Sequence, residues 1–269
     1  TVLYTGTGSN LAVTVGFQPD FIWTKARSAS DNHIVVDAIR GIGNILIPND
    51  TGAASNYGAF VSFDTNGFTK AAAESVSSRT YVAWNWKANG AGSSNTAGTI
   101  TSTVSASTTS GFSIVTYTGN ATSGQSVGHG LGVKPGFIIV KKRSATGGWV
   151  CWHQALTGGS EQDRYIYLDL TSASGTTTNY WGSGGITSST FGVWATGGDN
   201  NASGATFVAY VFAPVAGYSA FGSYTGNGSA DGPFVYLGFR PRYVLIKNAT
   251  DTGGNAWLVF DTARDTYNV

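Results

Sequence analysis

The 269-residue chain has few charged side chains, 11% of the total, where ordinary soluble domains have roughly 25%. Its formal net charge is +1, and the longest basic run is residues 141–143. Such a surface lacks the basic footprint that nucleic acid or an anionic membrane requires, so neither partner is expected. Glycine, serine, threonine and asparagine must supply the polar surface instead, which is typical of secreted or particle-bound β-proteins.

Cysteine and methionine are almost absent. The single cysteine, Cys151, excludes an internal disulfide, and its apolar neighbours predict a small buried side chain in place of a nucleophile. No apolar run approaches the roughly 20 residues of a membrane span, and residues 1–20 do not resemble a secretory leader. Since there is no methionine even at position 1, we expect the natural polypeptide to begin upstream.

A motif repeats along the chain. A Tyr-Thr-Gly sequence recurs at Tyr4, Tyr117 and Tyr224, so the period is roughly 110 residues. Each copy continues into a Gly-x-x-Pro turn and an apolar run that ends in lysine, in residues 16–25, 132–141 and 238–247. Proline fixes φ and cannot donate to a strand ladder, so it belongs just before a strand. The pattern predicts the same turn and strand three times.

Further strands align between the copies. Residues 33–37, 149–153 and 257–261 match one another, and the first two copies share a closing strand at 81–86 and 207–212. Asn66-Gly67 predicts a hairpin. Because the third copy lacks a closing strand, we expect its sandwich to be truncated at residue 269 and the natural polypeptide to continue.

We therefore predict an all-β fold of tandem antiparallel β-sandwich repeats of jelly-roll or lectin-like size. The first repeat is expected at residues 1–110, with a Ser/Thr/Gly-rich connection at 90–110 that includes a possible edge strand around Ile100–Val104. The second repeat is expected at 111–216 and the first half of a third at 217–269.

Catalytic constellations are sparse. Two groups of carboxylates were considered for glycoside hydrolysis, which needs a pair of acids: Asp37, Asp64 and Glu74, and Glu161, Asp163 and Asp169. The three histidines show no zinc-ligand spacing: they are His33, His129 and His153. The glycine clusters precede no helix that could bind phosphate. We predict no enzyme activity, no metal and no cofactor.

Aromatic side chains on loops are the best candidates for binding, because sugars stack on exposed rings. Trp181 and Trp194 have no counterpart in the first copy, and Asn179 and Tyr180 precede Trp181 in a glycine-rich segment. Loops specific to one copy are favoured binding positions. We predict that these four residues contact carbohydrate; the alternative is that they pack beneath a long loop.

The repeated motifs resemble units of large virion proteins of marine and cyanobacterial phages, classed as tail fibres or concanavalin-like repeats. The resemblance rests on residues 224–236, 238–241 and 261–265, and on the matching residues 111–119 and 127–132. It implies a virion location, with a tail appendage favoured over the capsid surface, and other virion proteins as partners. It assigns no catalytic or binding residue.

From these observations we expect a non-enzymatic structural protein of the phage tail that presents a surface for receptors or host-surface glycans. A homo-oligomer is expected, with a trimer favoured. One alternative is a capsid-bound decoration protein or head fibre with a purely structural role. A second alternative is a secreted bacterial adhesin that binds carbohydrate.

Overall fold

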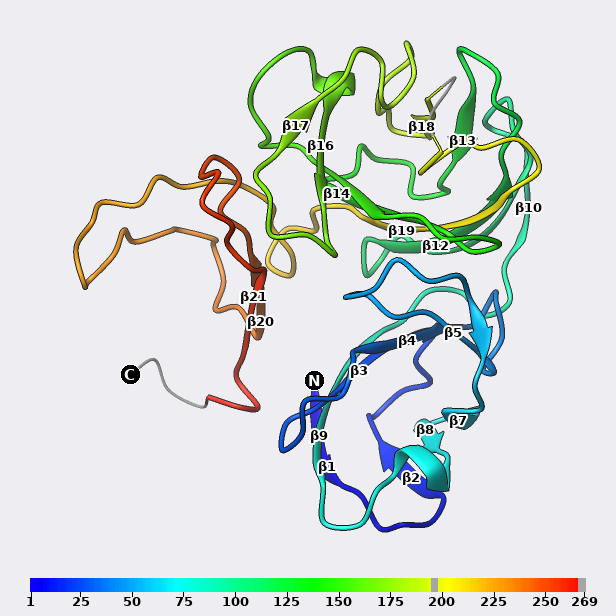
Figure 1. The fold of residues 1–269 in the computed structure, drawn as a ribbon, viewed down its shortest axis with the longest axis vertical. Coiled ribbons are helices and arrows are strands. Elements are labelled where there is room, and N and C mark those ends of the chain that lie inside the picture. Colours follow the sequence, from blue (N-terminus) through cyan, green and yellow to red (C-terminus); the bar gives the residue numbers. More distant parts are fainter. Residues whose placement is uncertain (195–197, 266–269) are drawn as a thin grey trace.

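The computed structural model describes residues 1–194 and 198–265, and antiparallel β-strands dominate it (Figure 1). This confirms the all-β sandwich class predicted from the sequence. By sheet membership we divide the chain into unit one (residues 1–89), unit two (90–213) and unit three (214–265). The two helices in the described residues are single 3-10 turns, η1 (Ala72–Glu74) and η2 (Glu161–Asp163), and neither could cross a membrane.

Unit one is a sandwich of two sheets. The main sheet has the order β1-β9-β3-β4, and the opposing sheet has the order β2-β8-β7. Thr65 and Asn66 form the turn that joins β7 to β8, with Asp64 opposite Gly67, which confirms the predicted hairpin. The bounds are β1 (Val2–Thr5), β2 (Leu11–Thr14), β3 (Phe21–Ala26), β4 (Ile34–Asp37), β5 (Asn44–Ile45), β6 (Ser55–Asn56), β7 (Phe60–Asp64), β8 (Gly67–Lys70) and β9 (Thr80–Trp86).

Unit two repeats this topology in a wider sheet of order β10-β11-β12-β19-β14-β15-β16-β17. Its central strands β12-β19-β14-β15 correspond in order to β1-β9-β3-β4, and β13 and β18 form the opposing layer. The bounds are β10 (Ser93–Asn95), β11 (Ser102–Ser107), β12 (Phe112–Thr118), β13 (Ser126–Gly128), β14 (Phe137–Lys142), β15 (Trp149–His153), β16 (Arg164–Tyr167), β17 (Gly175–Thr176), β18 (Thr190–Gly192) and β19 (Thr206–Phe212).

The stretch 90–110, expected to connect the repeats, joins the sheet of unit two. Strand β11 pairs with β12 along its whole length, and β10 pairs with β11. The alternation around Val104 puts that side chain into the core of unit two, so polar composition alone was a poor guide to this segment. Unit three contributes a hairpin of β20 (Tyr243–Ile246) and β21 (Leu258–Asp261), preceded by an extended arm at 217–242.

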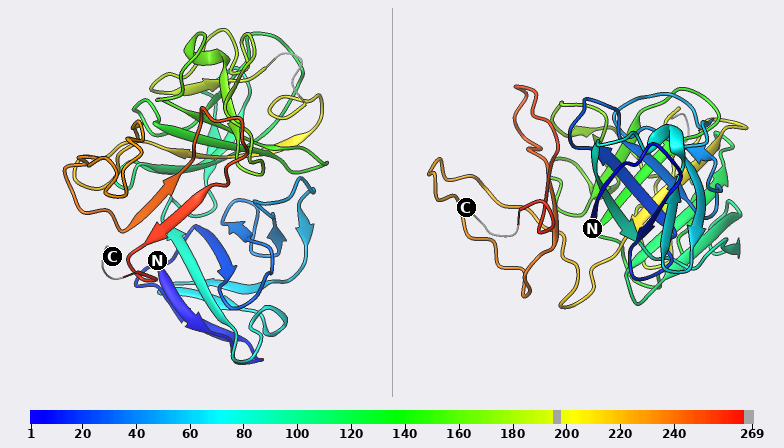
Figure 2. Two further views of the ribbon diagram at one scale, coloured as in Figure 1. Left: turned by 60° about the vertical axis from the view of Figure 1, so that its left-hand side comes forward. Right: turned by 90° about the horizontal axis from the view of Figure 1, so that it is seen from below.

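The main sheets of units one and two are buried on both faces. Alternate side chains of β3 separate accordingly: Ile22 packs inside unit one, while Phe21 and Trp23 pack in a cluster that residues of all three units share. Unit two has its own interior around Trp152. The units therefore pack side by side around one shared core, and the hairpin of unit three lies beside both other units (Figure 2).

A lysine contact joins unit two to unit one and recurs between units three and two. Lys141 Nζ donates to the carbonyl of Thr51 at 2.8 Å, and Lys247 Nζ donates to the carbonyl of Thr171 at 2.7 Å. Backbone hydrogen bonds recur as well: Ala54 to Arg143 and Gly147 to Thr51 in the first interface, and Ser174 to Ala249 and Asn255 to Thr171 in the second. Two interfaces are thus built from the same bonds at corresponding positions.

Tryptophan side chains repeat the same relation. Trp149 Nε1 donates to the carbonyl of Ile47 at 3.0 Å, and Trp257 Nε1 donates to the carbonyl of Tyr167 at 2.9 Å. Trp149 is the first residue of β15, and Trp257 directly precedes the aligned strand β21. Because buried indole N–H groups require an acceptor, these bonds fix how each unit sits on the preceding one.

A buried Asp-x-x-Arg pair near the end of β4 in unit one also contacts a side chain of unit two. Asp37 is the last residue of β4 and forms an ion pair with Arg40 in the turn that follows, and both side chains are fully buried. The hydroxyl of Tyr210, from β19, donates to Asp37 at 2.7 Å, and it accepts from Arg40 at 3.1 Å. Burial of two charges is tolerable here because each is paired and hydrogen-bonded.

Unit three makes the corresponding contact with unit one. Asp261 pairs with Arg264 at 2.6 Å, and it accepts a 3.0 Å hydrogen bond from Trp84 Nε1. Trp84 occupies in β9 the position that Tyr210 occupies in β19, judged by their partners Trp23 and Ile139 in the aligned strands. The guanidinium of Arg264 lies 5.3 Å from the ring centroid of Trp84.

Candidate functional site

Trp181 and Tyr180, two of the predicted carbohydrate contacts, are buried. Trp181 is 0% exposed and donates from Nε1 to the carbonyl of Arg164 at 2.8 Å, and Tyr180 is 2% exposed. A sugar can stack only on a ring whose face reaches solvent, so the prediction of direct contact is wrong for both. They follow the alternative of packing beneath a long loop.

Tyr180 nevertheless organises a group of aromatic rings at the surface of unit two. It stacks on Tyr165 with ring centroids 4.4 Å apart and on Trp194 with centroids 5.0 Å apart. Asn200 is buried; it donates to the carbonyl of Tyr180 and accepts from the backbone N–H of Trp194. The asparagine thus holds two of the predicted residues together.

A carboxylate completes this group. Asp199 accepts a hydrogen bond from the hydroxyl of Tyr167 at 2.7 Å and another from the hydroxyl of Tyr180 at 3.4 Å. Burial raises the pKa of the Tyr167 and Tyr180 hydroxyls above the usual value of a phenol, so both hydroxyls are protonated and can donate at neutral pH. We call Tyr165, Tyr167, Tyr180, Trp194 and Asp199 the aromatic cluster.

The aromatic cluster offers partly exposed rings beside a fixed carboxylate. Tyr165, Tyr167, Trp194 and Asp199 each retain partial exposure, while Tyr180 lies behind them. Apolar ring faces next to a hydrogen-bond acceptor suit a ligand with both apolar and hydroxyl faces, as a sugar has. Asn179, the remaining predicted residue, is exposed, and its backbone N–H donates to Asp163 at 2.7 Å.

Sequence reasoning missed three members of the aromatic cluster. Tyr165 and Tyr167 alternate on β16, and Asp199 lies more than thirty residues further on. The Tyr-x-Tyr alternation predicts that both tyrosines share one face of a strand. Their meeting with Asp199 depends on a loop closing over the sheet, for which the sequence carries no local signal.

Carboxylates considered for hydrolysis are engaged in structural bonds. Asp37 belongs to the interface with Tyr210, and Asp169 accepts from the backbone N–H of Trp149 at 2.9 Å. Asp163 closes the capping box of η2, and Asp64 accepts from two hydroxyls at the β7-β8 turn. Within residues 1–194 and 198–265, no group of three or more histidine, cysteine or acidic residues could hold a metal ion.

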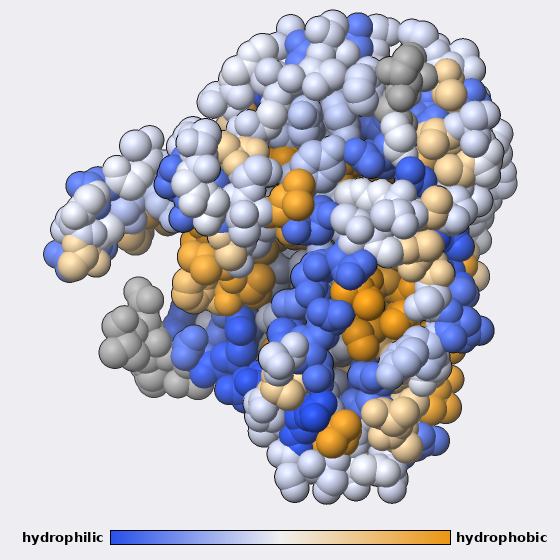
Figure 3. All heavy atoms as spheres, viewed as in Figure 1, coloured by the Kyte–Doolittle hydropathy of each residue, from blue (hydrophilic) through white to orange (hydrophobic). Residues whose placement is uncertain are grey.

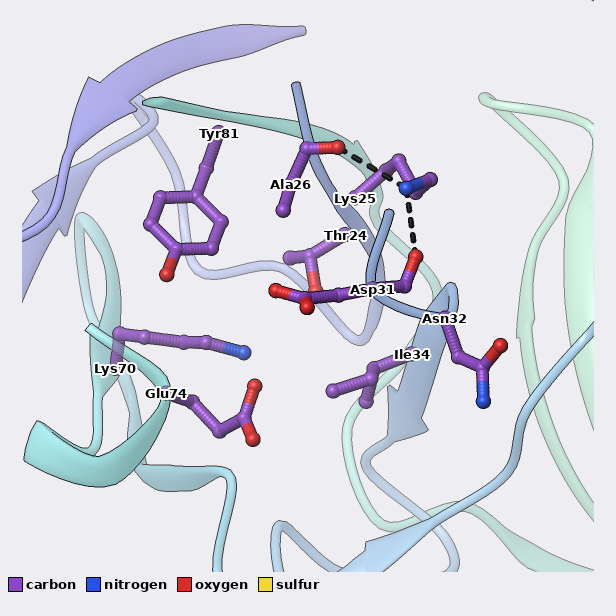
Figure 4. Close-up of a pocket in the computed structure, with 9 residues that line it drawn as sticks. All are labelled: Thr24, Lys25, Ala26, Asp31, Asn32, Ile34, Lys70, Glu74 and Tyr81. Atoms are coloured by element: carbon purple, nitrogen blue, oxygen red, sulfur yellow. Dashed lines mark hydrogen bonds between the residues drawn. The ribbon is translucent and has the colours of Figure 1, made fainter. Parts of the chain in front are cut away.

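Lys70 lines a small cavity in unit one. Burial lowers the pKa of Lys70 to about 8, and the charge of Glu74 partly opposes that shift. Figure 4 shows Lys70 and Glu74 below Tyr81, with Asp31 across the cavity. The cavity volume is about 10 Å³, close to the minimum that holds one water molecule. A substrate cannot enter, so this lysine is a buried structural group.

By fold and site, the chain is an all-β protein of side-by-side sandwich units with an aromatic cluster at its surface. All of residues 1–269 match the family described as "Domain of unknown function (DUF7483)", and the chain belongs to that family. No curated protein and no solved structure gives a significant match.

Proposed function

We propose that this protein is a non-enzymatic structural component of a phage virion, a tail fibre or related appendage that presents a surface for attachment to host receptors. The observation that carries the proposal is the repeated interface, in which Lys141 and Lys247, and Trp149 and Trp257, make corresponding bonds to the preceding unit. The resemblance of the Tyr-Thr-Gly units to virion proteins supports the location.

Rigid positioning follows from how the units are joined. Domains linked by small polar interfaces move relative to one another, whereas a large apolar interface fixes them. Here buried side chains of units one and two form one apolar cluster, and partly buried side chains of unit three pack against it. The ion pair of Asp37 and Arg40 within unit one is hydrogen-bonded to Tyr210 of unit two, which adds directional bonds to the apolar contact between these units. Such a body suits an appendage that must transmit force while holding its loops in place.

The aromatic cluster is the surface that we propose for glycan contact. Trp194 and Tyr165 would supply ring faces, and Asp199 would accept hydrogen bonds from sugar hydroxyls. A single shallow site of this kind binds weakly. Assembly of the chain as a homo-oligomer, with a trimer favoured, would raise the overall affinity through simultaneous attachment.

Labelling of intact particles with an antibody against unit one tests the location. Labels on the tail are expected. Labels confined to the capsid would overturn the tail assignment and favour a decoration protein or head fibre, and particles without label would contradict a virion location altogether. Incubation with host polysaccharide tests the non-enzymatic proposal, because release of reducing ends would refute it.

A glycan array tests the binding surface separately. Wild-type protein is expected to bind host-surface glycans, Trp194→Ala is expected to reduce that binding at least tenfold, and Tyr218→Ala serves as the control. Tyr218 is an exposed aromatic residue of unit three that is not a member of the aromatic cluster. Equal binding by the two variants would exclude the aromatic cluster as the glycan site.

A further inference from the structure

The aromatic cluster has two ring faces that a ligand can reach. Tyr180 stacks on Tyr165 with the ring planes inclined by 21°, and on Trp194 with the planes inclined by 24°. These two rings cover both faces of Tyr180, which is 2% exposed. Tyr165 and Trp194 keep partial exposure. A ligand that stacks on the cluster must therefore use the outer face of Tyr165 or of Trp194.

Glycines hold two rings of the cluster in place. A Cβ atom at Gly175 would lie 2.6 Å from the ring of Tyr165. A Cβ atom at Gly148 would likewise lie 2.6 Å from the ring of Tyr167, whose hydroxyl donates to Asp199 at 2.7 Å. The rings and the carboxylate are therefore in position before a ligand arrives, which lowers the entropic cost of binding.

Asp199 has one carboxylate oxygen available for a ligand. The hydroxyls of Tyr167 and Tyr180 both donate to Oδ2, at 2.7 Å and 3.4 Å. No described residue donates to Oδ1, and this atom is not one of the buried unpaired atoms, so it reaches solvent. Because the tyrosines already fix the carboxylate, Oδ1 can accept a charge-assisted hydrogen bond from a ligand with little further loss of side-chain entropy.

A charge of the opposite sign lies beside Asp199. A Cβ atom at Gly147 would lie 2.8 Å from Cε of Lys142 and 3.5 Å from Oδ1 of Asp199, so both side chains border the space beside that glycine. A Cβ atom at Gly198 would lie 3.8 Å from Nζ of Lys142. In the described part of the chain, Nζ forms no hydrogen bond and no ion pair with Asp199. The ammonium and the carboxylate are thus neighbours with a gap between them.

Charged groups are uncommon on a chain of this composition. Only 11% of the residues are charged. Figure 3 shows the face of unit two in view covered mostly by pale spheres, which mark residues of near-neutral hydropathy. An ammonium and a carboxylate that lie together beside stacked rings, and do not pair with each other, are therefore a particular feature of this site.

We propose that the aromatic cluster, together with Lys142, selects neutral sugars that have two adjacent hydroxyl groups over acidic sugars and amino sugars. The inference rests on the proposed function, because it names the class of sugar that the glycan site takes. One hydroxyl of the sugar donates to Oδ1 of Asp199, and the adjacent hydroxyl accepts from Nζ of Lys142. The apolar face of the sugar ring lies on Trp194 or Tyr165.

Charge disfavours the other two classes of sugar. An acidic sugar pairs with Lys142 but brings a second carboxylate close to Asp199, and an amino sugar pairs with Asp199 but brings a second ammonium close to Lys142. A neutral diol hydrogen-bonds to both charged groups and adds no repulsion. Because both groups are partly exposed, solvent screens the repulsion, and we expect discrimination of about fivefold.

Titration of the full chain with matched methyl glycosides, followed by saturation-transfer difference NMR, tests this selection. The probes are the neutral hexoside, its uronic acid and its 2-amino analogue, each in the gluco and the galacto series. The wild-type protein is expected to bind a neutral hexoside about fivefold more tightly than either charged analogue. Asp199→Asn keeps an acceptor oxygen for Tyr167 and is expected to abolish discrimination against the acid. Lys142→Gln is expected to abolish discrimination against the amine, and Lys87→Gln, at an exposed lysine outside the cluster, should change neither ratio.

Two results would overturn the selection while leaving glycan binding in place. The first is a charged analogue that binds the wild-type protein as tightly as the neutral hexoside does. The second is a pair of variants, Asp199→Asn and Lys142→Gln, whose affinity ratios match those of Lys87→Gln. Absence of binding by all of the glycosides would also overturn the inference, and if the wild-type protein fails to bind the glycan array as well, the proposed glycan contact itself is refuted.

Discussion

Removal of the Tyr210 hydroxyl is the most direct perturbation of the interface between units one and two. In Tyr210→Phe the ring keeps its packing, but the 2.7 Å donation to Asp37 and the 3.1 Å acceptance from Arg40 are lost. Tyr210 is 1% exposed, so water cannot replace the hydroxyl. The substitution therefore isolates the hydrogen bonds from the apolar contact.

The expected cost follows from the charge and burial of the partners. A hydrogen bond to a charged group contributes about 1.5–3 kcal/mol, and a buried acceptor left unpaired loses about as much. Asp37 keeps its ion pair with Arg40 and the 2.9 Å donation from the Arg40 backbone N–H, so part of its hydrogen bonding survives. We expect Tyr210→Phe to lower the free energy of unfolding by about 2 kcal/mol.

Urea denaturation followed by tryptophan fluorescence measures this change. Tyr218→Phe, at an exposed tyrosine, is the matched control and is expected to alter stability by less than about 0.5 kcal/mol. A double-mutant cycle with Asp37→Asn should give a coupling of about 1–2 kcal/mol. A loss no larger than that of the control, or zero coupling, would refute the assignment of the Asp37 contact as a stabilising link between units.

Three further predictions concern buried groups and the surface. Burial lowers the pKa of His33 and His153 from 6.5 to about 4. Because the unfolded chain binds more protons than the folded chain between these values, the free energy of unfolding should fall as the pH drops from 6.5 to 4. A urea midpoint that does not change over this pH range would contradict the prediction. Lys70→Met should raise stability at pH 7 by roughly 1–3 kcal/mol, and it should abolish the wild-type gain in stability between pH 8 and 10.5, as measured by urea denaturation. Trp181→Ala should lower the free energy of unfolding by about 3–5 kcal/mol, measured by thermal or urea denaturation, because it opens a cavity in the core. Trp194→Ala should lower it by less and should reduce glycan binding. Equal losses of stability in the two variants would contradict their different burial.

Much of the fold could be predicted because its signals are local. The Gly-x-x-Pro turns fix where β3, β14 and β20 begin, and alternation of large residues marks β9 and β19 as strands. The Asn-Gly pair at 66–67 marked the position of the hairpin, although Gly67 is the first residue of β8 and neither residue adopts a positive φ. Each of these signals lies within a few residues of the structure it determines, so no knowledge of the rest of the chain was needed.

The candidate site was predicted less well, because burial of a loop residue depends on what lies over it. Trp181 and Trp194 have similar polar and glycine-rich surroundings in the sequence, yet the first is fully buried and the second partly exposed. Tyr165, Tyr167 and Asp199 meet only after β16 and a distant loop come together. Composition and periodicity do not encode that meeting.

The sequence by itself indicated the main strands of a unit and the recurrence of that unit, since turn chemistry and period-two alternation act over short distances, whereas the order of the strands in each sheet came only from the structure. Only the tertiary structure decided which face of each sheet fills its own sandwich and which face meets another unit. Ile22 and Trp23 are adjacent and both apolar, yet one belongs to unit one and the other to the shared core. That choice depends on which surfaces are complementary between residues far apart in the sequence. Asp37 and Tyr210, for example, are 173 residues apart and form a hydrogen bond, which the residues next to either of them do not specify.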